Sequence, residues 1–335
     1  MNISRLLSVA PMMERTDRHC RYFFRLLSQQ TLLYSEMINA NAITKGNKTR
    51  LLNFSEIEHP LALQIGGSDP KLLAEATKIG VDWGYDEINL NVGCPSSRVS
   101  SGDFGAVLMK RKDHVAKCVD AMAQFSSNVP ISVKCRIAVD DQDPEEILPS
   151  FIKTVSNSGV SIFIIHARKA ILSGLSPKDN RKIPPIDYNL VKKIKAQFPK
   201  LEICLNGEIK DLSSVMNFIN DGIDGCMIGR EVYKNPSKIL ENADEKIFKK
   251  MDLFGKSKKR TLYEALLKMI PYLESHLLEG GKASSVLRHL INSVSGLEGA
   301  KLFRSTLSEN MNKKNQPEIF EKALKLVNFT DKKKM

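Results

Sequence analysis

The chain has 335 residues, of which 42% are hydrophobic and 26% charged, and this composition excludes a disordered or fibrous chain. No apolar run approaches the ~20 residues of a membrane span, and no apolar signal segment opens the sequence. The net charge is +12, and the 19 basic and 11 acidic residues from Asp244 to Met335 supply +8 of it. A nucleic acid partner would suit this basic region, although a solvated lysine-rich surface would also produce it.

The six cysteines form no CxxC pair, which argues against a disulfide framework and against a zinc site. We therefore expect a cytoplasmic protein that binds no metal and no membrane. We also expect it to be monomeric.

Along the first ~240 residues, short runs rich in Ile, Val and Leu alternate with amphipathic segments. The pattern predicts eight strands, at Leu7–Met12, Leu32–Met37, Leu61–Ile65, Glu87–Asn91, Ile131–Arg136, Ile162–Ala167, Glu202–Asn206 and Gly225–Ile228. Helices are predicted between them, at Asp69–Ile79, Asp113–Phe125, Pro144–Asn157, Asp187–Gln197 and Asp211–Asn220.

Eight strand–helix units in ~240 residues predict a (β/α)8 TIM barrel, with a doubly wound sheet as the alternative. We place this domain at residues 1–243. After it the pattern becomes helical, and we expect a small basic helical domain at residues 244–335, entered through a basic linker at 254–260 and ending in three lysines at 332–334.

A barrel carries its functional residues at the carboxyl ends of its strands. Glycine turns follow the last two predicted strands, at Asn206-Gly207-Glu208 and Gly229-Arg230, which favours a phosphate site there. Lys134 and His166 end two further strands. Each alone is explained as well by a solvent-reaching lysine or a core histidine, but with a phosphate site they favour flavin mononucleotide.

Cys94 lies at another strand end, in the run Asn89-Leu90-Asn91-Val92-Gly93-Cys94-Pro95. A cysteine is more often a small buried core residue, and the other five cysteines lie in apolar segments. Gly93 and Pro95 end the strand and can expose the thiol, which can donate a proton at neutral pH. We therefore expect Cys94 to be a general acid.

Several of these segments resemble signatures of the tRNA-dihydrouridine synthases. The resemblance runs from about Leu7 to Ala243 and more loosely through the tail, and two segments are similar to the A-type bacterial subfamily. The matching runs are Ala10-Pro11-Met12, Thr16-Asp17-Arg18-His19-Cys20-Arg21, Leu63-Gln64-Ile65-Gly66-Gly67-Ser68-Asp69-Pro70, Asn89 to Ser96, Ile164-Ile165-His166-Ala167-Arg168-Lys169-Ala170 and Leu172-Ser173-Gly174-Leu175-Ser176-Pro177-Lys178.

The resemblance implies an enzyme that reduces uridine to 5,6-dihydrouridine at D-loop positions 20 and 20a. It implies that NADPH reduces FMN, that FMN transfers a hydride to C6, and that Cys94 protonates C5. Residues at FMN-binding positions would be Pro11, Met12, Gln64, Lys134, His166, Asn206, Gly207, Glu208 (through its backbone N–H), Gly229 and Arg230. Residues at tRNA-binding positions, for the D-loop and elbow region, would be Asn91, Lys178, Arg181, Lys301 and Arg304.

Two residues depart from the family pattern. Glu208 stands where a second glycine is usual, and its carboxylate would repel a phosphate unless the side chain turns away. Arg15 replaces a residue that is commonly Trp. Two alternatives remain open, namely a flavin oxidoreductase for a free pyrimidine such as dihydroorotate, which has no need of a basic tail, and a non-catalytic RNA-binding protein, which would be expected to lack Cys94 or Lys134.

Overall fold

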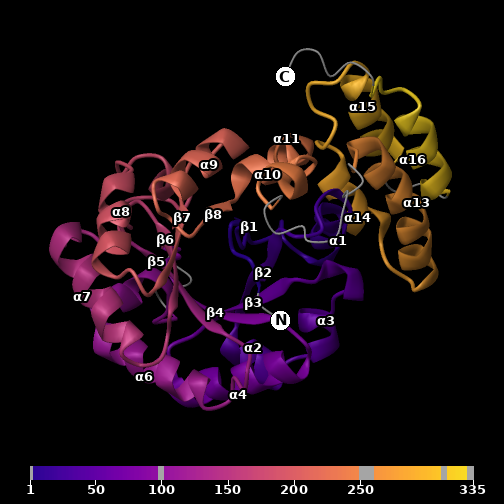
Figure 1. Ribbon diagram of the computed structural model, residues 1–335. Helices are drawn as coiled ribbons and strands as arrows, with labels where there is room; N and C mark the ends of the chain where they lie inside the picture. Colours follow the sequence, from indigo (N-terminus) through magenta and orange to yellow (C-terminus); the bar gives the residue numbers. More distant parts are fainter. Residues whose placement is uncertain (1–2, 97–101, 249–259, 311–314, 330–335) are drawn as a thin grey trace. The chain divides into compact units, whose positions relative to one another are not determined.

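The computed structural model describes residues 3–96, 102–248, 260–310 and 315–329. Eight parallel strands form a closed barrel in chain order, with β8 paired back to β1 (Figure 1). They are β1 Leu7–Val9, β2 Leu32–Asn39, β3 Leu61–Gly66, β4 Glu87–Val92, β5 Ile131–Arg136, β6 Ile162–His166, β7 Glu202–Asn206 and β8 Gly225–Ile228. The TIM-barrel prediction is confirmed. Most of the expected basic linker, residues 254–259, and the lysines at 332–334 lie outside the described residues.

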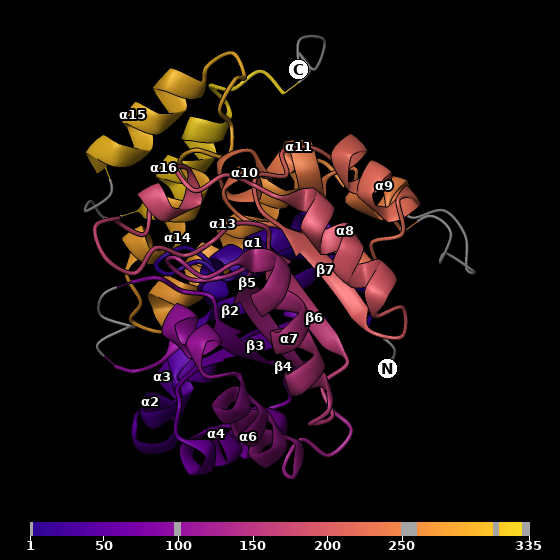
Figure 2. The same cartoon turned by 90° about the vertical axis from the view of Figure 1, so that its left-hand side faces the viewer.

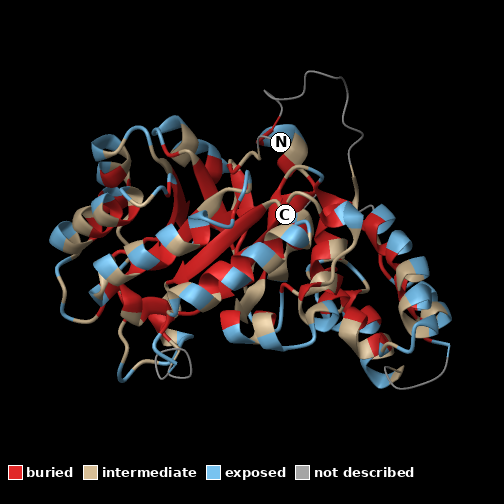
Figure 3. Ribbon diagram, turned by 90° about the horizontal axis from the view of Figure 1, so that it is seen from below, coloured by how far each residue is buried: buried red, intermediate tan, exposed pale blue. Residues whose placement is uncertain are grey.

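The five helices predicted around the barrel form, each beginning within one residue of its predicted start, whereas α2 and α3 were not predicted. The first backbone N–H groups of four predicted helices donate to the side chains of Asp69, Asp143, Asp187 and Asp211, which cap α4, α7, α8 and α9. Figure 2 shows α7 and α8 outside the strands, and in Figure 3 such helices bury one face and expose the other. The elements are α2 Ala40–Lys45, α3 Lys48–Leu52, α4 Pro70–Asp82, α6 Lys112–Ala123, α7 Pro144–Ser156, α8 Tyr188–Gln197, α9 Leu212–Asn220 and the 3-10 turns η1 Glu56–Glu58, η2 Gly105–Lys110 and η3 Asp179–Arg181.

The inside of the barrel is apolar on one side and polar on the other. An apolar cluster includes Leu32, Tyr34, Ile162, Ile164 and Met227. Alternate residues of β3, β4 and β5 instead bring amide, hydroxyl and carboxylate groups inward, in a fold whose interior is usually filled by branched apolar side chains. Gln64, Asn89 and Ser132 are buried and paired in register across the three strands, and buried Glu87 lies two residues before Asn89 on β4.

The structure divides the chain into two compact units that differ from the expected division after residue 243. The barrel unit comprises 1–13 and 32–228, whereas the helical unit comprises 14–31 and 229–335. The helices of the second unit are α1 Arg18–Leu27, α10 Arg230–Lys234, α11 Pro236–Leu240, α12 Ala243–Lys246, α13 Leu262–Leu278, α14 Ala283–Leu290, α15 Ala300–Asn310 and α16 Gln316–Leu324.

Contacts within the helical unit explain why an N-terminal segment belongs to it. Asp17, the cap of α1, forms ion pairs with Arg288 and with buried His289. At the other end of α1, the Asp244 carboxylate accepts hydrogen bonds from Ser28 and from the backbone N–H of Gln29. Both ends of α1 are thus fixed by residues more than 200 positions later in the chain.

Candidate active site

Cys94 lies on the loop that follows β4. The Oδ1 atom of Asn91 accepts hydrogen bonds from the backbone N–H groups of Gly93 at 3.1 Å and Cys94 at 3.0 Å, which closes a tight turn at the end of the strand. Cys94 is half-buried, while the other five cysteines are buried and all six are free thiols. The turn therefore leaves this thiol the most accessible of the six.

Lys134 lies inside the barrel on β5. Its ammonium group donates to Asn206 Oδ1 at 3.1 Å, and Asn206 Nδ2 donates to the carbonyl oxygen of Met227 at 2.7 Å. Burial, reinforced by the charge of Arg136, lowers the pKa of Lys134 to about 8. Two of the expected flavin residues, on β5 and β7, are therefore in direct contact.

His166 and Gly207 meet at the ends of β6 and β7. Gly207 has a φ of +127°, and a Cβ atom at this position would lie 3.0 Å from the His166 ring. Only glycine allows this backbone to pass so close to the histidine. The expected role of Gly207 in a phosphate turn stays a prediction.

Gln64 and Asn91 contact each other inside the barrel. The Asn91 Nδ2 atom donates to Gln64 Oε1 at 2.8 Å, and Gln64 Nε2 donates to Asn89 Oδ1 at 2.7 Å. Each amide retains one N–H with no acceptor among the described residues. The expected contacts of Gln64 with FMN and of Asn91 with the target uridine stay predictions, and each would have to use that remaining N–H or a shared oxygen.

Arg136, which the sequence did not mark as a site residue, connects the loops that follow β4 and β6 at the mouth of the barrel. It is 3% exposed, and its guanidinium donates to the carbonyl oxygens of Gly93, Lys169 and Asn180 at 3.1–3.2 Å. Burial lowers its pKa to about 10, so it stays charged at neutral pH, and that charge interacts with Cys94. The available signal in the sequence was a second basic residue at the end of the predicted strand, two positions after Lys134.

Glu208 directs its carboxylate onto Arg168. The Oε2 atom of Glu208 lies 2.7 Å from Arg168 Nη2, and Arg168 is almost fully buried. Glu208 has a φ of +50°, a region that favours glycine, which agrees with the glycine usual at this position. Because Arg168 neutralises the carboxylate, the departure from the family pattern is compatible with a nearby phosphate.

The remaining expected site residues are distributed over both units. Pro11 and Met12 follow β1 and are half-buried, and Lys178 and Arg181 lie in and beside η3, where Lys178 is exposed. In the helical unit, Gly229 caps α10 and Arg230 begins it, Lys301 and Arg304 lie on α15, and the guanidinium of Arg15 lies 4.7 Å from the ring centre of Tyr233. Their proposed ligand contacts stay predictions.

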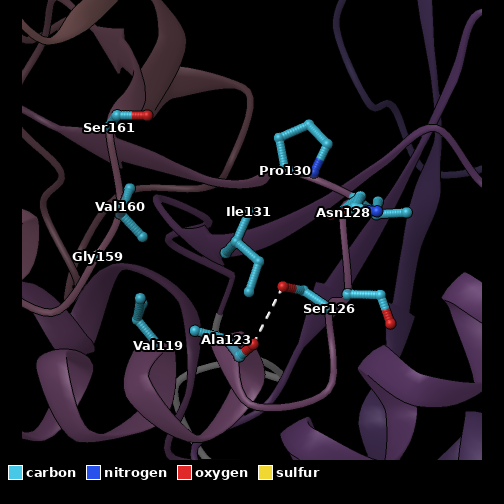
Figure 4. A pocket seen from close by; sticks show the side chains of 11 residues that line it. Val119, Ala123, Ser126, Asn128, Pro130, Ile131, Gly159, Val160 and Ser161 are labelled. Atoms are coloured by element: carbon cyan, nitrogen blue, oxygen red, sulfur yellow. Dashed lines mark hydrogen bonds between the residues drawn. The ribbon is translucent and has the colours of Figure 1, made fainter. Parts of the chain in front are cut away.

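A pocket of about 220 Å³ lies at the amino ends of β5 and β6, away from these residues (Figure 4). Its lining residues, which include Val119, Ser126 and Ser161, carry no charged side chain. It therefore offers no group for acid–base or redox chemistry. In the described part of the chain, no group of His, Cys, Asp and Glu side chains is arranged to hold a metal, and no helix is long and apolar enough to cross a membrane.

Comparisons with known proteins agree with this geometry. The old yellow enzyme homologue from Zymomonas mobilis superposes with a TM-score of 0.54 at 12% identity over 77% of this chain and 94% of its own, and morphinone reductase with a TM-score of 0.50 at 11% identity over 77% and 90%. At these identities the likeness shows the barrel fold alone.

Sequence relatives are much closer. The tRNA-dihydrouridine(20/20a) synthase of Synechocystis sp. is 47% identical over 96% of this chain and 95% of its own length. The Escherichia coli enzyme of the same name is 49% identical over 96% and 91%. The dihydrouridine synthase family profile matches residues 8–330. The resemblance seen in the sequence is confirmed, and the chain belongs to the dihydrouridine synthase family.

Proposed function

We propose that the protein is an FMN-dependent tRNA-dihydrouridine synthase that uses NADPH to reduce uridines 20 and 20a of the tRNA D-loop. Family membership supports the reaction, and the names of the similar enzymes support the positions. The single structural observation that carries the proposal is a half-buried thiol, Cys94, beside two cationic side chains at the mouth of the barrel, half-buried Lys134 and buried Arg136.

The residues at the strand ends fit a flavin. Lys134 and Asn206 form a polar contact inside the mouth, and the backbone of Gly207 passes directly beside His166 at the ends of β6 and β7. FMN held there would supply the hydride that adds to C6 of the uracil. Lys134 would stabilise negative charge on the flavin, and His166, Gly207 and the backbone N–H of Glu208 would face its polar groups. Gly229 and Arg230 stay predicted contacts of the FMN phosphate.

Cys94 is suited to protonate C5. A neutral thiol can donate a proton, which leaves a thiolate on Sγ after transfer. Arg136 interacts electrostatically with Cys94 and its side chain holds the carbonyl of Gly93, so it would stabilise that thiolate. Cys135, which lies on β5 opposite Val92, is fully buried, and burial raises its pKa to about 12. Cys135 is therefore a poor alternative acid.

The target base must leave its stack to reach an acid inside a barrel mouth, as in other enzymes that modify bases. Exposed Lys178 and the half-buried Arg181 on the loop after β6 would then contact the tRNA near the site. Lys301 and Arg304 lie three positions apart on α15, which puts them on one helix face for contacts with phosphates.

The deciding experiment measures dihydrouridine at positions 20 and 20a of tRNA incubated with the protein, FMN and NADPH. We expect Cys94→Ala to slow single-turnover reduction about 10²- to 10⁴-fold, the usual contribution of a general acid, while NADPH oxidation by oxygen continues. The control is Cys118→Ala, which removes a buried thiol and should react normally. Wild-type rates in Cys94→Ala, or turnover of a free pyrimidine such as dihydroorotate but not of tRNA, would overturn the proposal.

A further inference from the structure

A continuous column of side-chain hydrogen bonds runs through the barrel from a buried carboxylate to the Cys94 turn. At its base, Ser132 Oγ donates to Glu87 Oε1 at 2.5 Å, and Asn89 Nδ2 donates to Ser132 Oγ at 2.7 Å. Gln64 and Asn91 continue the column with bonds of 2.7 and 2.8 Å, and Asn91 ends it at the backbone N–H groups of Gly93 and Cys94.

Every bond in the column runs in the same direction. Each amide donates toward Glu87 and accepts from the side of Cys94, so that the group dipoles are aligned. The direction is set at the base, because an ionised carboxylate can only accept hydrogen bonds. Glu87 therefore makes Ser132 a donor, which makes the Ser132 oxygen the acceptor for Asn89, and the same constraint passes through Gln64 to Asn91.

At the base of the column, the Glu87 carboxylate is paired with a buried arginine. The guanidinium of Arg5 lies 2.7 Å from Glu87 Oε2, and the Tyr34 hydroxyl donates to Oε1 at 2.5 Å. Arg5 and Tyr34 are both buried. Tyr34 is thus bonded to the same carboxylate oxygen as Ser132, but it lies outside the column.

We propose that Glu87, Ser132, Asn89 and Gln64 are positioning residues for Cys94, because their one-directional column orients the Asn91 carbonyl that fixes the Cys94 turn. The inference rests on the proposed function for its effect on turnover. Hydrogen bonds in such a network reinforce one another in a low-dielectric interior. If the column were cut at its base, the side-chain amides could rotate by half a turn. The Asn91 Nδ2 would then face the backbone N–H groups of Gly93 and Cys94, which now donate hydrogen bonds to the Asn91 oxygen.

The test compares Ser132→Ala with Tyr34→Phe. Each variant removes one hydroxyl bond to Glu87 Oε1, but only Ser132→Ala breaks the column. Two measurements are made on the purified FMN-loaded protein. One is the single-turnover rate of tRNA reduction, and the other is the rate at which iodoacetamide alkylates Cys94, with the modified peptides identified by mass spectrometry. The five buried cysteines serve as internal references for general unfolding.

We expect Ser132→Ala to reduce tRNA at least tenfold more slowly even at saturating FMN and tRNA, because a misplaced reacting group is costly even when binding is complete. We also expect faster alkylation of Cys94 alone, since its turn is loosened, and wild-type behaviour from Tyr34→Phe. Should Ser132→Ala fail to fold, Asn89→Ala breaks the column one bond higher and is judged in the same way.

Equal alkylation and turnover in Ser132→Ala and Tyr34→Phe would overturn the positioning role, as would a change that affects all six cysteines alike. The alkylation comparison needs no tRNA. A wild-type protein that forms no dihydrouridine would therefore refute the proposed function while leaving the column to be judged by Cys94 reactivity.

Discussion

The low pKa of Lys134 predicts that FMN affinity depends on pH in a range where few side chains titrate. Burial is the main cause of the pKa of about 8, and Arg136 adds to it. If bound FMN requires the ammonium form, its dissociation constant should be constant below pH 8 and rise about tenfold for each pH unit above it. At pH 9.5 the expected weakening is roughly 30-fold, or about 2 kcal/mol.

The assay is flavin fluorescence quenching between pH 7, where the FMN phosphate is already ionised, and pH 9.5. Lys134→Met should bind weakly with no such pH dependence, and Lys134→Arg, which stays charged, should remain flat at higher affinity. In the apoprotein, wild type should gain stability relative to Lys134→Met as the pH rises from 8 to 10.5, because the folded state releases the proton first. A flat wild-type profile, or the same slope in Lys134→Met, would show that the charge of Lys134 does not hold FMN.

Three further outcomes are expected. Glu208→Gln should lower the free energy of unfolding by about 1–2 kcal/mol, because buried Arg168 loses its carboxylate, and a chemical denaturation curve unchanged from wild type would contradict the pairing. Replacing both Lys301 and Arg304 with Ala should flatten the salt dependence of tRNA binding by roughly one to two phosphate contacts, and superimposable salt series would show that this helix face is only solvated. Burial lowers the pKa of His19 to about 3, so its neutral form stabilises the fold fully above about pH 6.5 and progressively less as the pH falls toward 3. Urea unfolding should show about 2 kcal/mol of this loss by pH 5 in wild type and clearly less in His19→Asn, and equal losses in both would assign the effect to other groups.

The sequence by itself predicts the barrel because its information is local. A strand reveals itself by a short apolar run and a helix by an aspartate cap and amphipathic spacing, and both are readable within about ten residues. For this reason β5, β7 and β8 have the predicted bounds, and Asp69, Asp143, Asp187 and Asp211 cap helices. Cys94 could also be selected locally, because glycine and proline surround it at a strand end.

Only the tertiary structure decides which distant residues meet. No pattern near Asp17 in the sequence indicates that it pairs with His289. Contacts of this kind place the segment 14–31 in the helical unit, although it lies between two barrel strands in the sequence. Arg168 neutralises Glu208 from 40 positions away, and Arg136 secures the Cys94 turn from the next strand. The column from Glu87 to Asn91 exists because parallel strands in register place alternate side chains of β3, β4 and β5 side by side inside a closed barrel, and a hydrogen bond between two strands leaves no periodicity in either of them.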